Sequence, residues 1–434
     1  MCTLYGWRIN KRRYGGDWHK VFKQVTQREN LPKELMQEFR EYCLRIHLKN
    51  ASNTAYWKEI FEHYGINTNA ADIFSEYKKI PVINKRNVQK NVESFLNPYY
   101  HGNTYQTKTS GSTGAGLSFP MTVLAEQVQW ATWWRYRLWH NINPDQWCGY
   151  FGGRAIVPST QKYPPFYRIN KSGKQVMFSS YHLNSETVSH YLEVIRKKEI
   201  KWLHGYSSQL ALLAHLAHEK SLEVPKIDII TLGAEGVSQK TKELLKEVFN
   251  CPVREHYGLA EGVANISECG HGNFHIDEDF SMVELMPVYK GSNKYRIIGG
   301  NWHNSYFVLL RYDTGDIATL DDRICLCGKP GRIVSQIDGR SEDYIVLKDG
   351  TRVGSLNQIF KVISEAREAQ IYQRIAGYVT VRIVKGGNYD KKSEEALTKK
   401  FHEFFGPKLE FKIEYWDELP RTTAGKLRMV VSEL

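Results

Sequence analysis

The chain contains a loop of glycine and hydroxyl residues whose composition suits phosphate binding: Thr109, Ser110, Gly111, Ser112, Thr113 and Gly114. Successive backbone N–H groups in such a turn can surround an oxyanion, because glycine places no Cβ in the way, and the hydroxyls add donors. Gly111 and Gly116 have the spacing of a Walker P-loop, but Leu117 stands where that motif requires lysine. An ordinary kinase or NTPase is therefore not predicted, and a flexible polar turn is the alternative.

The missing cation is offered at the far end of the chain, where the sequence PRTTAGK ends at Lys426. A lysine near a terminus is usually no more than a solvent-exposed side chain. A Thr/Gly-rich loop on a separate domain can also bring a cation to phosphate and withdraw it by rotation about a hinge. The two segments together favour the second interpretation.

Cysteine and histidine gather in two further segments, which suggests a metal site. Cys269, His271 and His275 lie in ECGHGNFH, and Cys325 and Cys327 lie in a C-x-C-G turn. Thiolates and imidazoles favour zinc, and four protein ligands would make the site structural. We predict Cys269, His275, Cys325 and Cys327 as ligands, with His271 as the rival imidazole. The alternative is that these cysteines are small apolar side chains.

Length and composition indicate a globular protein with a sizeable core. The 434 residues are 41% hydrophobic and 24% charged, which suits about two or three domains. Seven cysteines, an odd number, argue against a disulfide framework and for a reducing compartment. No stretch approaches the roughly 18 apolar residues that a membrane span needs. We expect a cytoplasmic protein whose net charge of +12 suits anionic ligands.

The order of apolar and polar segments predicts the elements that position these residues. The first hundred residues read as helices, up to about Tyr100. Strand-like runs at 201–204 and 227–232 then alternate with helical stretches at 208–220 and 238–249, which predicts a parallel sheet covered by helices. From Arg296 onward closely spaced strands are expected. The last part, from about Asp338, reads as two short strands around 348–350, a helix at 355–367, a hairpin at 369–384 and a helix at 392–405.

Five motifs in this order resemble the adenylate-forming acyl-CoA synthetase superfamily: TSGSTG at 109, HYGLAE at 256, YDTGD at 312, GR at 339 and PRTTAGK at 420. The length, HGYSS at 204 and the cysteine-bearing insertion near 265–330 are most similar to the phenylacetate-CoA ligase and CapK-like capsule-biosynthesis branch, some members of which carry such a zinc site. The resemblance implies an α/β fold. A large adenylation domain at 1–337, with mixed or parallel sheets and a β-rich subdomain, would precede a small mobile α+β domain at 338–434.

The resemblance also implies roles for the motif residues. The loop at 109–114 would hold the β- and γ-phosphates of ATP, Glu261 would hold Mg²⁺, and Lys426 would donate to the α-phosphate and the attacking carboxylate. Asp316 and Arg340 would bind the ribose, and Glu342 would be the hinge. The adenine would lie between Tyr257, with its neighbours His256 and Gly258, and a wall formed by Gly233, Ala234 and Glu235.

Two of these assignments have ordinary alternatives, and two positions depart from the family pattern. Asp316 in a D-x-G-D segment is often only an Asx-turn, and Arg340 alone would be a solvated cation. The family often has Pro-Lys after its phosphate loop, where this chain has Ala115-Gly116-Leu117, so Arg154 or Lys108 would have to compensate. Arg421 replaces a frequent lysine.

The carboxylate pocket is expected around segments 130–140, 151–154 and 204–208. The residues that we assign to it are Trp134, Arg154, His204, Gly205, Tyr206 and Ser208. Trp134 shares a helical face with Ala131 and Leu138, and such a stripe is more often part of a core. Aromatic walls would suit an aryl or apolar acid, whereas Arg154 and the histidines could hold a second polar group on the acid.

The predicted function is ATP-dependent activation of a small carboxylic acid as an acyl-adenylate, with release of pyrophosphate, followed by transfer to a thiol, with CoA as the default acceptor. The alternative acceptor is an amine or sugar in surface polysaccharide or natural-product assembly. A basic nucleic-acid-binding protein is disfavoured, because no recognition module is visible. An inactive scaffold is disfavoured too, because Glu261, Asp316, Arg340 and Lys426 are all present. A homodimer is compatible with the sequence.

Overall fold

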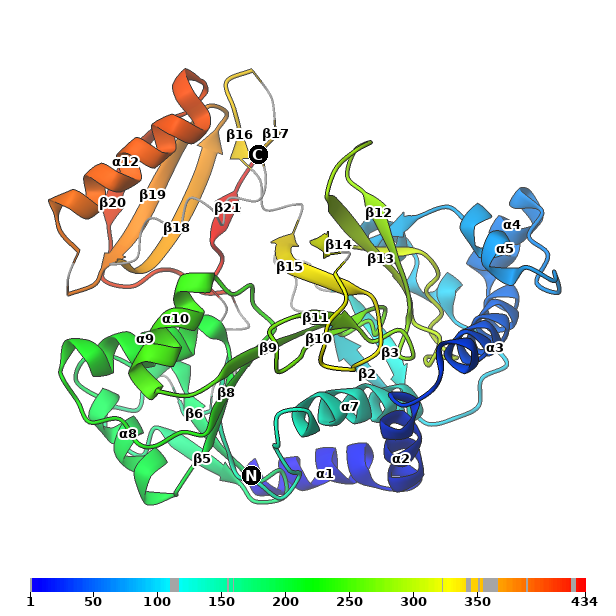
Figure 1. The fold of residues 1–434 in the computed structure, drawn as a ribbon, viewed down its shortest axis with the longest axis horizontal. Helices are drawn as coiled ribbons and strands as arrows, with labels where there is room; N and C mark the ends of the chain where they lie inside the picture. The colour runs from blue at the N-terminus through cyan, green and yellow to red at the C-terminus, as the bar shows by residue number, and fades with distance from the viewer. Residues whose placement is uncertain are drawn as a thin grey trace. The chain divides into compact units, whose positions relative to one another are not determined.

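The computed structural model describes residues 2–109, 117–153, 156–158, 160–321, 323–340, 345–349, 352–353, 366–387, 389–422 and 427–434 (Figure 1). This part of the chain forms two compact units. The first comprises Thr3–Pro144 and Glu255–Ile337, and the second comprises Asp145–Arg254 and Asp338–Leu434. The first unit ends at Ile337 and the second unit resumes at Asp338, which is the predicted domain boundary. The chain also passes from one unit to the other after Pro144 and after Arg254. The predicted domains 1–337 and 338–434 therefore stay a prediction.

Helices form the N-terminal part of the first unit, which confirms the prediction for the first hundred residues. Thr54 caps the helix α4 (Ala55–Tyr64) by accepting a hydrogen bond from Trp57 N. Gly65 ends α4 at φ 61°, a conformation that glycine adopts without strain. The elements are α1 (Cys2–Tyr14), α2 (Trp18–Arg28), α3 (Lys33–Ser52), α4 (Ala55–Tyr64), α5 (Ile73–Lys79), α6 (Lys85–Lys90) and a 3₁₀ turn at Val92–Phe95.

The sheet of the first unit is built mainly from antiparallel neighbours, in the order β12-β13-β14-β15-β11-β10-β9, with β1 parallel to β14. It confirms the closely spaced strands expected after Arg296. Its strands are β1 (Ile83–Asn84), β9 (Val253–Gly258), β10 (Asn265–Glu268), β11 (Phe274–Ile276), β12 (Met282–Pro287), β13 (Lys294–Gly300), β14 (Tyr312–Asp321) and β15 (Ile333–Arg340).

A separate hairpin, β2 (Thr104–Lys108) and β3 (Ser118–Thr122), leads directly into the long helix α7 (Val123–Leu138). Thr122 caps this helix by accepting a hydrogen bond from Ala125 N. Along the stripe noted in the sequence, Ala131 and Trp134 are buried but Leu138 is 37% exposed. The stripe is therefore core at its first two positions only.

A buried arginine on α7 anchors the first unit. Arg135 donates to both carboxylate oxygens of Asp279, at 2.8 and 2.9 Å, and to Asp277 at 2.7 Å. Arg28 of α2 also donates to Asp279, at 2.8 Å. The charges of Arg135 hold the pKa of Asp279 well below its usual range, although burial opposes this. The Arg135 guanidinium therefore bridges two buried carboxylates, and Arg28 supplies a second positive charge to Asp279.

We predict that Arg135→Met destabilises the fold strongly, because it leaves the buried Asp277 without a cation and Asp279 with Arg28 alone. The expected loss is about 3–5 kcal/mol in the free energy of unfolding. Urea denaturation followed by circular dichroism measures it. The control is Arg323→Met, because Arg323 is 78% exposed in its pair with Asp321, so its loss should leave the free energy of unfolding almost unchanged. Equal losses in the two variants would contradict this account.

His47 of α3 is fully buried and hydrogen-bonded through Nε2 to Leu309 O at 2.9 Å. Burial lowers its pKa from 6.5 to about 4. On acidification the unfolded chain therefore binds this proton before the folded chain does, so stability falls as the pH drops from about 6.5 toward 4.

We predict that moving from pH 7 to pH 5 costs the folded state about 1–2 kcal/mol through His47 alone. Urea midpoints measured across this range should fall more steeply for the wild type than for His47→Gln. A change at the exposed His63, His63→Gln, should leave the slope unaltered. An identical slope in all three proteins would refute the role of His47.

The second unit contains the predicted alternation of strands and helices. Strands β6, β4, β7 and β8 run parallel in that order, with β5 antiparallel at the edge, so the parallel sheet is confirmed. The strands are β4 (Cys148–Gly152), β5 (Tyr167–Asn170), β6 (Gln175–Ser179), β7 (Trp202–Gly205) and β8 (Ile229–Gly233). The helices are α8 (Val188–Lys197), α9 (Ser207–Glu219) and α10 (Gln239–Phe249), with a 3₁₀ turn at Ser180–His182.

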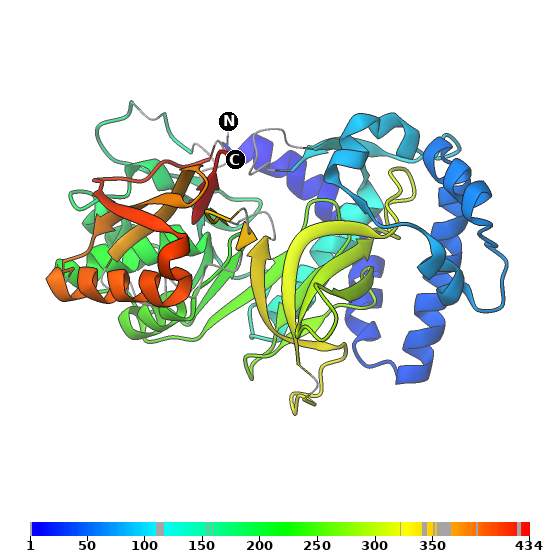
Figure 2. The same ribbon diagram turned by 90° about the horizontal axis from the view of Figure 1, so that it is seen from above.

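The C-terminal part of the second unit has its own sheet, β20-β19-β18-β21, and a helix, α12, that packs on it (Figure 2). The predicted hairpin and last helix are confirmed. Most of the predicted helix at 355–367 lies outside the described residues, and its last two residues begin β18 instead. The elements are β16 (Ile345–Val346), β17 (Arg352–Val353), β18 (Ala366–Ile375), β19 (Tyr378–Lys385), α12 (Lys391–Phe405), a 3₁₀ turn at Gly406–Lys408, β20 (Glu410–Tyr415) and β21 (Val430–Ser432).

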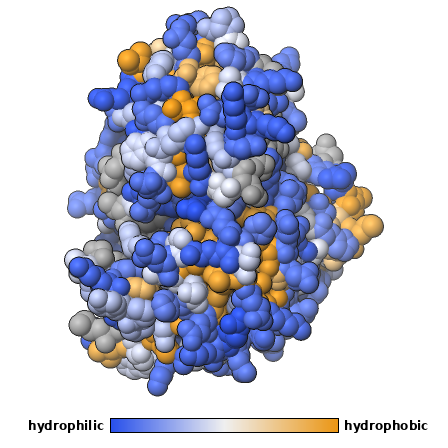
Figure 3. Space-filling model, turned by 90° about the vertical axis from the view of Figure 1, so that its left-hand side faces the viewer, coloured by the Kyte–Doolittle hydropathy of each residue, from blue (hydrophilic) through white to orange (hydrophobic). Residues whose placement is uncertain are grey.

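The fold is therefore α/β with mixed sheets and an α+β C-terminal part, as predicted. The face drawn in Figure 3 is covered mainly by hydrophilic side chains, with hydrophobic ones in smaller areas between them. Among the described helices, none has the combination of length and hydropathy that crossing a bilayer would require.

Candidate functional site

The predicted phosphate loop joins the two strands of the β2–β3 hairpin. Thr109 N donates to Leu117 O, and Leu117 N donates to the Thr109 hydroxyl, both at 2.9 Å. These bonds close the base of the loop, and Leu117 is buried in the core. Leu117 therefore fixes the loop to the fold instead of supplying a cation. Ser110, Gly111, Ser112, Thr113 and Gly114 lie outside the described residues.

The HYGLAE and YDTGD motifs are joined by two reciprocal hydrogen bonds. Tyr257 of the first motif donates to Asp316 of the second at 2.6 Å, and Tyr312 of the second donates to Glu261 of the first at 3.2 Å. Both carboxylates are buried, at 6–7% exposure. Burial, and then the charge of Asp316, raises the pKa of Tyr257 well above its usual range, so this phenol stays a donor.

The turn that carries Asp316 is shaped by its neighbours. Gly315 has φ 76° and donates its N–H to Asp313 Oδ1 at 2.9 Å, while Asp316 N donates to the Thr314 hydroxyl at 3.0 Å. The Asx-turn that the sequence left as an alternative therefore exists, but Asp313 forms it. The carboxylate of Asp316 is directed to Tyr257 instead.

Glu261 lies beside a small cavity in the first unit. The cavity has a volume of about 10 Å³, room for about one water molecule, and its polar lining includes Gln129, Asn301 and His303. Asn301 also donates to the backbone oxygen of Glu261 at 3.3 Å. The turn after β9 is thus held by side chain and backbone together, and it presents a hard carboxylate ligand of the type that Mg²⁺ prefers.

His256 and Gly258 flank Tyr257 on β9. The half-buried ring of His256 lies 5.5 Å from Trp133 and 5.3 Å from Tyr136, measured between ring centroids, and burial lowers its pKa to about 3. The imidazole of His256 is therefore uncharged at neutral pH and packs against these two rings as an aromatic side chain. A Cβ at Gly258 would lie 2.8 Å from Asn265 Oδ1, which explains the glycine.

In the second unit, the predicted adenine wall is connected to the predicted substrate segment. Ala234 has φ 67° after the end of β8, and the carboxylate of Glu235 reaches the first turn of α9. There it accepts from Ser208 N at 3.0 Å and from the hydroxyls of Ser207 and Ser208 at 3.2 Å. Glu235 thus occupies the positive end of this helix.

The other predicted pocket residues are divided between the two units. His204 Nδ1 lies 2.9 Å from the Thr231 hydroxyl, and Tyr206 N donates to Phe151 O at 2.8 Å. Gly205 is required there, because a Cβ would lie 2.0 Å from Phe151 O. Trp134 belongs to the first unit.

Trp134 makes core contacts in that unit. Its indole N–H donates to Tyr14 OH at 3.1 Å, and the Arg137 guanidinium lies 4.6 Å from its ring centroid. These contacts favour the core interpretation that the sequence left open. Arg154 lies outside the described residues.

The C-terminal lysine loop is anchored at its base. Arg421 forms a β-bridge with Leu427, and its guanidinium donates to Glu368 of β18, with both side chains largely buried. Nothing in the sequence linked Glu368 to this loop. Lys426 and Glu342 lie outside the described residues, and of Arg340 only the backbone is described, at the end of β15.

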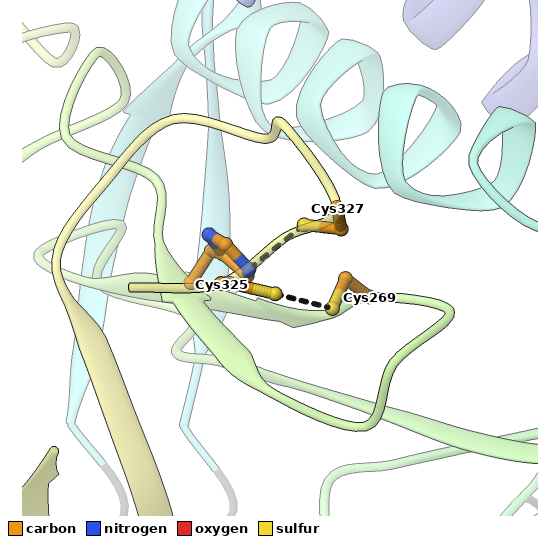
Figure 4. Close-up of side chains that lie close together, drawn as sticks. Cys269, Cys325 and Cys327 are labelled. Atoms are coloured by element: carbon orange, nitrogen blue, oxygen red, sulfur yellow. Dashed lines mark hydrogen bonds between the residues drawn. The ribbon is translucent and has the colours of Figure 1, made fainter. Parts of the chain in front are cut away.

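The four predicted zinc ligands lie together in the first unit. The ligand atoms of Cys269, His275, Cys325 and Cys327 are all within 4.8 Å of one another. Cys269 follows β10, His275 is on β11, and the other two lie in the turn between β14 and β15 (Figure 4). Cys269 Sγ and Cys325 Sγ are 3.7 Å apart. His271, the rival imidazole, is exposed and is not part of this cluster.

The hydrogen bonds around the cluster orient its donor atoms. His275 Nδ1 lies 3.0 Å from Pro330 O, which makes it the protonated nitrogen, and Nε2 lies 3.3 Å from Cys327 Sγ. The side chain of Asn273 and the backbone N–H of Lys329 donate to Cys325 and Cys327 at 3.1 and 3.4 Å. Such outer contacts fix a ligand's tautomer and support thiolates.

Comparison with known proteins finds two relationships at the level of sequence. The CapK C-terminal domain family matches residues 345–433. Over 442 aligned residues the chain is 24% identical to Protein CapK of Staphylococcus aureus, with 100% of this chain and 96% of that protein covered.

Solved structures of CoA ligases share the fold. A 2-hydroxyisobutyryl-CoA ligase in the postadenylation state, in complex with R3-HIB-AMP, has a TM-score of 0.70 at 13% identity, covering 94% of this chain and 91% of that one. Its complex with 2-HIB-AMP and CoA has a TM-score of 0.58 at 14% identity, with the same coverage. The anthranilate CoA ligase AuaEII with anthranoyl-AMP has a TM-score of 0.51 at 13% identity, covering 74% of this chain and 65% of that one.

Proposed function

We propose that this chain, a CapK-like protein with the adenylate-forming fold, activates a carboxylic acid with ATP and then transfers the acyl group. The observation that carries the proposal is the reciprocal pairing of Tyr257 with Asp316 and of Tyr312 with Glu261. It holds two buried carboxylates in fixed orientations, and burying carboxylates is unfavourable unless they have partners or a ligand to bind.

In the first half-reaction, a carboxylate oxygen of the acid attacks the α-phosphorus of ATP and the bond to pyrophosphate breaks. Two anions must meet, so the site has to neutralise charge that grows in the transition state. We assign this role to Lys426 and to the backbone N–H groups of the loop at 109–114. Glu261 would hold Mg²⁺, which neutralises phosphate charge when bound.

We assign the adenosine part of ATP mainly to residues whose side chains are held in place by hydrogen bonds. An ionised carboxylate can accept from both ribose hydroxyls, and Asp316 is held for this by Tyr257. Because Tyr257 donates to Asp316, its ring is fixed by the same bond, which suits a face for adenine. Arg340 would add the second ribose contact. The Gly233-Ala234-Glu235 segment of the second unit is also assigned to adenine, and within it Glu235 is fixed by α9.

In the second half-reaction, an acceptor attacks the acyl carbon and AMP leaves. We propose a thiol, with CoA as the first choice, because the two solved ligases compared above are CoA ligases and one of them was solved with CoA. An amine or sugar acceptor keeps the same first step. A requirement for CoA during release of AMP distinguishes the two, since an amine-transferring ligase would retain its adenylate when CoA is added.

We also propose that Cys269, His275, Cys325 and Cys327 hold a structural zinc ion. Three sulfurs and one imidazole form a donor set of the Cys₃His type, and His275 already has the tautomer that leaves Nε2 for a metal. Four protein ligands leave no open position, so the ion would stabilise the turns that follow β10 and β14 and take no part in the chemistry.

We predict that Lys426→Ala lowers acid-dependent exchange of labelled pyrophosphate into ATP by about 10²-fold or more, because it removes a charge stabiliser of the transition state. A panel of carboxylic acids would first identify one that supports exchange in the wild type. The matched control is Lys412→Ala, a change at an exposed lysine of β20 that pairs with Glu414. Near-normal exchange in Lys426→Ala would refute the role of this lysine.

We predict that the purified protein contains about one equivalent of zinc, and that Cys269→Ser and Cys327→Ser lose it. Metal content is measured by mass spectrometry, and stability by thermal unfolding with and without a chelator. The control is Cys43→Ser, at a cysteine of α3 outside the cluster. A wild-type protein without metal, whose melting temperature is unchanged by chelator, would contradict the zinc proposal and leave the adenylation proposal intact.

A further inference from the structure

One face of α1 exposes large apolar side chains next to basic ones. Leu4, Tyr5 and Trp7 are 58%, 59% and 51% exposed, and Arg8 and Lys11 are exposed beside them. We propose that this surface, the α1 outer face, docks onto the surface of an anionic lipid bilayer. This use of α1 is independent of the adenylation chemistry.

The spacing of these residues places them on one side of the helix. Leu4, Trp7, Arg8 and Lys11 follow the i, i+3, i+4, i+7 pattern, and Tyr5 lies at the edge of the same side. Apolar residues of a surface helix usually face the core. Here Leu4 and Trp7 are exposed beside two cations, and these are the two kinds of side chain that contact acyl chains and anionic headgroups at a membrane surface.

The last turn of α1 is fixed to α7, which runs beside it (Figure 1). Arg12 donates to both carboxylate oxygens of Glu126, at 2.5 and 2.9 Å, and Arg13 donates to the same group at 2.8 Å. Gln127 donates to Gly15 O at 2.8 Å, and the Arg13 guanidinium lies 4.0 Å from the Trp130 ring centroid. The basic run therefore has two roles: Arg12 and Arg13 attach the helix, while Arg8 and Lys11 face outward.

The positive charge of the α1 outer face indicates what kind of partner it can bind. α1 contains no acidic residue, and among the described residues no ion pair is formed by Arg8 or Lys11. A second copy of the same surface would bring like charges together, which disfavours self-association through it. An anionic bilayer offers phosphates to the cations and an acyl boundary to Leu4, Tyr5 and Trp7. Trp and Tyr prefer that boundary because their rings are amphipathic.

The test is sedimentation of the full chain with vesicles of phosphatidylcholine alone and with vesicles in which about a third of the lipid is phosphatidylglycerol. We expect binding to the anionic vesicles only, weakened by high salt. The double change Arg8→Gln and Lys11→Gln should weaken binding roughly 30-fold, and Trp7→Ser roughly ten-fold. The control Tyr42→Ser removes an equally exposed aromatic from α3 and should leave binding unchanged.

Three outcomes would overturn the proposal: no binding of the wild type to anionic vesicles, an equal loss in Tyr42→Ser, or a change of sedimentation coefficient in Trp7→Ser without lipid. The last would make the surface an interface between copies of the chain. Unfolding midpoints equal to the wild type show that the variants are folded. Pyrophosphate exchange in solution should not change, so failure here and failure of the adenylation proposal are distinguishable.

Discussion

Two tyrosine–carboxylate hydrogen bonds connect the parts of the first unit that are proposed to bind nucleotide. Each motif supplies the donor for the other motif's acid, so neither carboxylate can turn away without breaking a bond that the other motif provides. A buried carboxylate without partners would be destabilising. The pairing therefore makes β9, its following turn and β14 one cooperative structure, and Asn301 extends that structure to the backbone of the turn.

The same unit shows how this protein accommodates charge in its interior. Arg135 pairs with Asp277 and Asp279, and Asn265 and Ser267 donate to the remaining oxygen of Asp277 at 2.6 and 2.7 Å. Such a network contributes little net stability compared with apolar packing, but removing one partner is expensive. This charge network joins α7 and α2 to the segment after β11. It therefore fixes α7, which begins where the β2–β3 hairpin ends.

The sequence predicted the α/β class, the helices of the first hundred residues, the parallel sheet and the C-terminal hairpin, because each rests on a local period of apolar residues. The four clustered Cys and His residues also follow from local motifs. The reciprocal tyrosine bonds could not be predicted, because they depend on a pairing over 59 and 51 positions of separation. Arg135 was missed for the same reason, since a buried arginine on a helix looks like any exposed one until its partners are placed.

Leu117 and Trp134 show the limit of reading single positions. Leu117 was noted as a missing lysine, and its side chain instead belongs to the core that holds the hairpin. Trp134 was assigned to a pocket, but its side chain is buried and contacts Tyr14 at the end of α1 and Arg137 of α7. In both cases the residue type suited two environments, and only the packing of distant segments decides between them.

The cluster of three cysteines and one histidine follows closely in the chain on both motifs of the proposed nucleotide site. Cys269 follows the strand after Glu261, and Cys325 follows the strand that carries Asp316. Their sulfurs are 3.7 Å apart and would have to approach to about 2 Å to form a disulfide. Such a bond would use two of the four sulfur and imidazole donor atoms and pull the ends of both segments toward each other, so an oxidant that forms it would strain the two segments that carry Glu261 and Asp316.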